Sequence, residues 1–189
     1  MIDTTLTFLL DQLNQHLSSR FPAPAQHAVI GRIGVSGTAA QDLTNKMVLT
    51  LINVEREGIA ANTSKQFSVR DDTTTRVSQP LNINLVFLVA ANFDDDYKDG
   101  LKILSAVIDF FQAHPLFLSQ TTPDMPDTLE RISVEWSDMD LQATHNLWTV
   151  LGGSYLPSVA YKARMIVVED AWTRGETPII TGTQVSSSS

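Results

Sequence analysis

A chain of 189 residues, 43% hydrophobic and 18% charged, is long enough to bury a core and too apolar for global disorder. The absence of cysteine excludes disulfides, thiolate metal sites and thiol nucleophiles. The formal net charge is −8 and the basic residues are scattered singly, so we expect no nucleic-acid partner, because a phosphate backbone would be repelled.

No segment has the pattern of a membrane anchor or an export signal. The longest apolar stretch, residues 85–91, is far shorter than the ~20 residues that cross a bilayer. Residues 1–4 lack the basic start and apolar core of a secretory signal. We therefore expect folding in the cytoplasm and no direct membrane insertion.

The first predicted element is an amphipathic helix of about four turns. Apolar residues recur at helical spacing over residues 2–17, Asp3 can cap the start, and the proline-containing segment 21–24 cannot continue a helix. Residues 28–33 then indicate a short strand, and the glycines of 34–37 indicate the turn after it.

Two longer strands follow, separated by a polar segment. Residues 47–55 are apolar and β-branched, and residues 81–91 begin with clean alternation. Over residues 86–89 both faces become apolar, which predicts cover by helices on each side or by a partner chain. The intervening residues 58–79 form either a projecting hairpin or a segment that orders against a partner, and we favour the partner.

The second main helix begins at the acidic residues 94–96, whose carboxylates suit a helix N-terminus, and ends at His114 before a proline. Residues 132–137 alternate as a half-buried strand. A short helix with an apolar face that includes Leu141 runs from its cap, Asp140, to glycines at 152–153. Residues 159–167 form the last strand.

This order of elements predicts an α/β (α+β) fold with a single mixed sheet of about four to five strands, packed by two main helices and one short helix. We expect one domain over residues 1–170. Residues 171–189 are polar and end in four serines, so we expect a flexible C-terminal tail that orders only on assembly.

The residues that could carry chemistry do not form a recognisable motif. The acidic run Asp94–Asp99 lacks the ligand spacing of a calcium loop, so helix capping is the simpler interpretation. The four histidines are isolated in the sequence, and Ser154 lacks the flanking pattern of a nucleophile elbow. We therefore predict no catalytic residues, no metal site and no cofactor.

Contact with other chains is the more plausible use of the conspicuous side chains. Trp136 and Trp148 fall on apolar periodicities and are expected in the core, whereas Trp172 lies in the polar tail and is a candidate contact. Lys162 and Arg164 share the polar face of the last strand. The predicted partner contacts are Phe67, Arg70, Arg76, Lys162, Arg164 and Trp172.

Several strings, taken in order and with their spacing, resemble a known family. They are DQLN at 11–14, NKMVLTLINVE at 45–55, LNINL at 81–85, LSAVI at 104–108, NLW at 146–148 and YLPSV at 155–159. The chain resembles, over residues 2–168, the domain shared by tube-terminator (cap) proteins of extracellular contractile injection systems, the phage-tail-like particles of the antifeeding-prophage and virulence-cassette type.

The resemblance implies a non-enzymatic protein that forms a hexameric ring on the last ring of the inner tube. There it would end tube growth and anchor the contractile sheath, so its partners would be further copies of itself, the tube protein and the sheath protein. The particle would be assembled in the cytoplasm and could be released. Two alternatives stay open: a phage tail-completion or neck subunit, and a metal-dependent enzyme that uses Asp94–Asp99.

Overall fold

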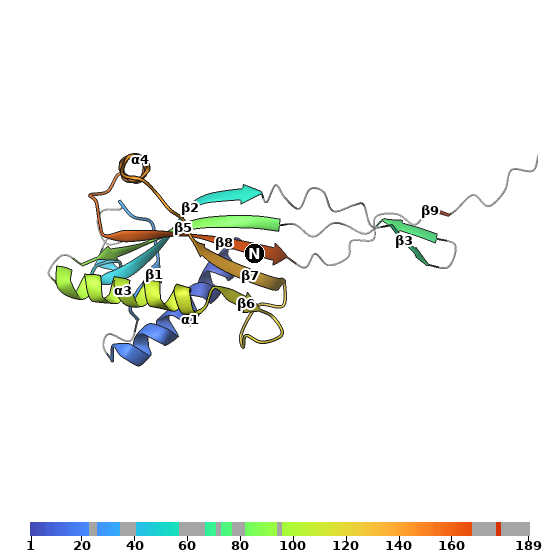
Figure 1. The fold of residues 1–189 in the computed structure, drawn as a ribbon, viewed down its shortest axis with the longest axis horizontal. Coiled ribbons are helices and arrows are strands. Elements are labelled where there is room, and N and C mark those ends of the chain that lie inside the picture. The colour runs from blue at the N-terminus through green and yellow to red at the C-terminus, as the bar shows by residue number, and fades with distance from the viewer. Residues whose placement is uncertain are drawn as a thin grey trace, which may run out of the picture.

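The computed structural model describes residues 1–22, 26–34, 41–56, 67–70, 73–76, 82–93, 96–167 and 177–178. Within these residues, a six-stranded sheet carries three helices (Figure 1). The predicted α+β class, the mixed sheet, and the set of two main helices and one short helix are confirmed. Whether residues 1–170 form one domain followed by a tail stays a prediction.

The six-stranded sheet is mixed because one edge strand runs parallel to its neighbour and the other pairs are antiparallel. In spatial order its strands are β1 (Ala28–Ile30), β2 (Lys46–Arg56), β5 (Asn82–Asn92), β8 (Ser158–Val167), β7 (Leu129–Trp136) and β6 (Leu116–Leu118). The sequence predicted the other five but not β6, because its three residues show no period and, unlike β1, are not followed by turn glycines.

Helices cover both faces of this sheet. The long helices α1 (Ile2–Arg20) and α3 (Tyr97–Ala113) lie on one face, and the short helix α4 (Leu141–Leu151) lies on the other (Figure 1). Phe87 and Val89 are buried in the core beneath α1 and α3, whereas Leu88 is buried with Trp148 of α4. The prediction of helical cover on each side of residues 86–89 is confirmed.

Three further strands form a separate small sheet. The antiparallel pair β3 (Phe67–Arg70) and β4 (Thr73–Arg76) makes a hairpin, and β9 (Thr177–Pro178) pairs with β4. The total number of strands therefore exceeds the predicted four to five. Within residues 58–79 the structure thus has a hairpin, which was the less favoured of the two interpretations of this segment. The remaining residues of the segment lie outside those described.

One side chain ties α1 to the edge of the sheet. Asn14 donates a hydrogen bond from Nδ2 to the Ala28 carbonyl (2.9 Å) and accepts bonds at Oδ1 from the backbone N–H groups of His27 (3.1 Å) and Ala28 (2.9 Å). An amide side chain can serve both kinds of backbone group at once, and no aliphatic residue can replace it.

Replacing Asn14 with alanine is expected to lower the free energy of unfolding by about 2–3 kcal/mol, because three part-buried backbone groups lose their partner. Chemical denaturation followed by circular dichroism measures the change. Asn146→Ala is the matched control, since its side chain is exposed and its amide oxygen accepts a hydrogen bond from the exposed Gln142 of the same helix. Equal losses in the two variants would contradict this role for Asn14.

Candidate partner-binding surface

Helix α4 covers only part of its face of the sheet. Trp148 and its neighbours form a small apolar cluster at one end of the face, made of Ile33, Val48, Leu88, Ala90, Trp148 and Ala160. Further along the central strands, around the apolar Val86, this face carries five polar residues: Glu55, Asn84, Glu135, Lys162 and Arg164. We call these five residues the polar half-face.

Ion pairs cross the strands on the polar half-face. Lys162 Nζ lies 2.9 Å from Glu55 Oε2, and Arg164 Nη2 donates a hydrogen bond to Glu135 Oε2 at 3.0 Å. The hydrogen bond from Lys162 holds the pKa of the Glu55 carboxyl below its usual range. All four side chains remain partly open to solvent, so these pairs add little stability and are free to exchange for contacts with another chain.

Asn84 gives the polar half-face an unused hydrogen-bond acceptor. This residue is only 5% exposed, and its Oδ1 has no hydrogen-bond partner among the described residues. The buried Oδ1 of Asn82, two positions along β5, lacks one as well. A buried polar atom without a partner is costly, and a second chain could supply a donor to it once the side chains that cover it rearrange.

The structure places two of the six predicted contact residues together on β8 and sets Phe67 of β3 opposite Arg76 of β4. Lys162 and Arg164 lie two positions apart on β8, on the same face. Phe67 and Arg70 belong to β3 and Arg76 to β4, but their side chains lie outside the described part of the structure, as does Trp172. The role of all six as contacts stays a prediction.

A second surface appears where the sequence predicted core. Trp136 is 53% exposed and rests its ring against Tyr161 at a centroid distance of 5.9 Å. The prediction that Trp136 is buried was wrong because strand alternation continues to the last residue of β7, beyond the point where other elements cover the strand. Trp148, by contrast, is buried as predicted.

Trp136 borders a groove of about 440 Å³ between α4 and the neighbouring ends of β7 and β8. Its wall includes Leu141 and Tyr155, and Leu141 is 90% exposed although the sequence placed it on the apolar face of the helix. Leu141 is the first residue of α4, so its side chain lies before the turn that packs on the sheet. No sequence signal distinguishes such a residue from a buried one.

The acidic run caps a helix. Asp96 accepts a hydrogen bond at Oδ1 from the backbone N–H of Asp99 (3.2 Å) at the start of α3, and Asp99 pairs with Lys102. Asp94 and Asp95 lie outside the described residues. In the part of the chain that the structure describes, no three His, Asp or Glu side chains lie together as a group that could hold a metal ion.

The other candidate groups also have structural surroundings. The ring of His27 is buried, with Nε2 2.8 Å from the Phe21 carbonyl. Ser154 lies beside Gly34, Gly152 and Gly153 in a pocket of about 330 Å³. His16 and His114 are far apart in the sequence, and their ring centroids lie 6.4 Å apart where α1 crosses α3.

The fold and this surface define an α+β protein whose six-stranded sheet has helices on both faces and an open polar half-face. The chain belongs to the family described as the Pvc16 N-terminal domain, whose family model matches residues 4–182. The family resemblance inferred from the sequence is therefore confirmed. A comparison with curated proteins gives no match.

Two solved structures share the fold at 13% sequence identity, and each matches 94% of this chain. One is the PVC sheath/tube terminator of an extracellular contractile injection system in the extended state, with a TM-score of 0.51. The other is the tube-terminating cap of the anti-feeding prophage, with a TM-score of 0.53. The chain spans 63% and 59% of their respective lengths. None of the described helices is long and apolar enough to cross a membrane.

Proposed function

We propose that this protein is a structural cap that ends the inner tube of a contractile injection system and anchors the last layer of its sheath. The family match over residues 4–182 carries this proposal, and the fold shared with two tube terminators supports it. Both of those proteins belong to injection systems, so the comparisons do not favour a phage tail-completion or neck subunit. The role requires no catalysis, cofactor or metal.

In this role, copies of the chain form a hexameric ring that matches the rotational symmetry of the tube. A closed ring needs two different complementary patches on each copy, and further surfaces must meet the tube protein and the sheath protein. The net charge of −8 per copy disfavours a nucleic-acid partner. The ring assembles in the cytoplasm, needs no membrane insertion, and leaves with the particle if the particle is released.

We assign one of these contacts to the polar half-face. Its ion pairs are exposed enough to rearrange, and Asn84 offers an acceptor that a partner can fill. Phe67, Arg70 and Arg76 of the hairpin, together with Trp172, are the other proposed contact residues. Residues 58–79 and the tail after Trp172 would gain order on assembly.

Electron microscopy of particles assembled without this chain tests the cap role. We expect tubes of variable length with the sheath detached or missing at one end, because no ring stops tube addition or holds the sheath. Restoring the intact chain should restore uniform length. Particles of normal, uniform length with an attached sheath in the absence of the chain would rule out the proposal.

The same assay tests the polar half-face. Lys162→Glu with Arg164→Glu should fail to restore uniform particles, because both cations that pair on this surface are reversed. Lys98→Glu with Arg32→Glu changes the net charge by the same amount at exposed sites elsewhere and should restore them. Thermal unfolding of each purified variant checks that both pairs of substitutions leave the chain folded.

A further inference from the structure

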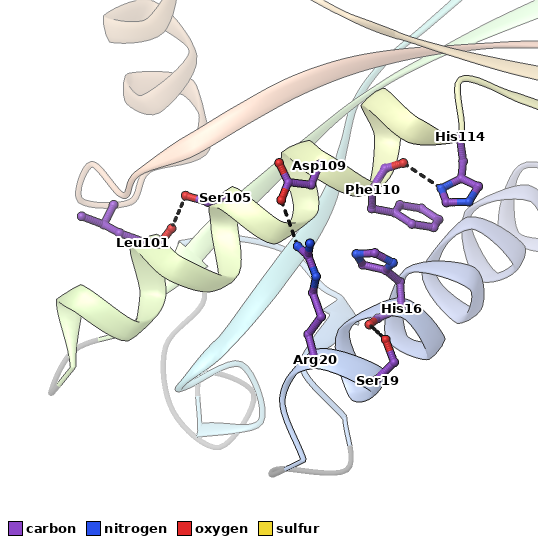
Figure 2. A network of polar contacts seen from close by, with 8 residues as sticks. All are labelled: His16, Ser19, Arg20, Leu101, Ser105, Asp109, Phe110 and His114. Atoms are coloured by element: carbon purple, nitrogen blue, oxygen red, sulfur yellow. Dashed lines mark hydrogen bonds and ion pairs between the residues drawn. The ribbon is translucent and has the colours of Figure 1, made fainter.

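Four ionisable side chains lie together where α1 crosses α3 (Figure 2). His16 and Arg20 come from α1, Asp109 comes from α3, and His114 is the residue that caps the C-terminus of α3. Arg20 Nη1 lies 2.9 Å from Asp109 Oδ2, and the two histidine rings are 6.4 Å apart between centroids. The crossing therefore holds one carboxylate, one permanent cation and two imidazoles.

Both imidazoles pack on the same core residue. The Phe110 ring centroid lies 5.3 Å from that of His16 and 5.0 Å from that of His114, and Phe110 itself is buried. His114 Nδ1 lies 3.0 Å from the Phe110 carbonyl oxygen, which can only accept, so this nitrogen carries the proton. His16 Nε2 is buried and has no hydrogen-bond partner among the described residues.

The charge balance of the crossing depends on the protonation of His16. With this ring neutral, Asp109 balances Arg20. A proton on His16 would place a second cation beside the one carboxylate, and the new charge would sit on a partly buried ring. Like charges at this spacing repel, and burial adds a desolvation cost to the charged form.

We propose that His16, Arg20, Asp109 and His114 form an acid-sensitive clasp that holds α1 against α3 at neutral pH and loosens when His16 is protonated. The two helices together cover one face of the sheet, so the clasp affects how firmly they pack on that face (Figure 1). The inference rests on the geometry of the crossing and does not require the cap role.

The pKa of His16 supports this assignment. Burial lowers it below the ordinary value of 6.5, the nearby cation Arg20 and then His114 lower it further, and Asp109 opposes them. A group whose pKa is lower in the folded than in the unfolded chain favours unfolding when it binds a proton. The free energy of unfolding should therefore be unaffected by His16 above pH 6.5. It should decrease as the pH falls below 6.5 and through the pKa of His16 in the folded chain.

Histidine side-chain NMR of the full chain provides the first test. His16 should titrate below 6.5, Arg20→Gln should raise its midpoint by removing a cation, and Asp109→Asn should lower the midpoint by removing the carboxylate. These opposite shifts would not arise from a merely structural histidine. A midpoint at or above 6.5, or one that neither substitution moves, would overturn the clasp.

Denaturant unfolding at pH 7.5 and pH 5.0 provides the second test. The midpoint concentration should fall on acidification in the native chain and fall clearly less in His16→Phe, which keeps an aromatic ring on Phe110 without a titrating nitrogen. His145→Phe replaces an exposed histidine of α4, and its midpoint concentration should fall as much as that of the native chain. Equal falls in all three proteins would count against the proposal, and the NMR titration of the native chain decides the matter if His16→Phe does not fold.

Discussion

Replacing Phe87 with alanine is expected to lower the free energy of unfolding by about 3–5 kcal/mol. Phe87 is fully buried in the middle of β5, and its ring packs against those of Phe111 (5.9 Å between centroids) and Tyr161 (5.7 Å), which also contact each other. Alanine would leave a cavity at the point where α3 meets the central strands. Such a loss is a large share of the about 5–15 kcal/mol that stabilises a typical domain.

Denaturant unfolding of the full chain measures this loss. Tyr97→Ala removes an aromatic ring of similar size from a site that is 58% exposed at the start of α3, and it should change the free energy of unfolding by less than about 0.5 kcal/mol. If Phe87→Ala lost no more than Tyr97→Ala, the core beneath α3 would not be packed as described.

Gly34→Ala is expected to have the second largest effect, about 2–5 kcal/mol, because strain in the left-handed backbone adds to a steric clash. The φ angle of Gly34 is +81°, and a Cβ there would clash with the carbonyl oxygen of Leu151, at the end of α4. The obstacle is backbone, so it cannot move aside as a flexible side chain does. The substitution should separate α4 from the turn after β1.

Gly152→Ala separates the two causes. Gly152 also has a positive φ angle, +71°, but a Cβ there would meet no atom within 4 Å. This control carries the backbone strain alone, so it should cost about 1–2 kcal/mol. Thermal or denaturant unfolding of the two variants should therefore rank Gly34→Ala as the more damaging, and the reverse order would show that contact with α4 is unimportant.

Local signals in the sequence predicted most of the fold. Period placed α1, α3 and α4, and Asp140 caps α4 as expected by accepting a hydrogen bond from the Ala143 N–H (2.7 Å). The expectation that Asp3 caps α1 was wrong, because the helix begins at Ile2 with Met1 at its N-cap and Asp3 lies inside the first turn. Alternation placed the long strands, and the two-sided apolar run at 86–89 predicted cover on both faces. These features depend on residues that are close in the chain, so a single sequence contains them.

The sequence by itself therefore determined the class, the helices, the long strands and, through resemblance, the family. The tertiary structure alone decided that Trp136 is exposed, that Lys162 and Arg164 pair with Glu55 and Glu135, and that His16 meets His114. Each of these facts joins residues from different elements or depends on where a neighbouring element stops. Their positions follow from how α1, α3 and α4 pack on the sheet, which no local period encodes.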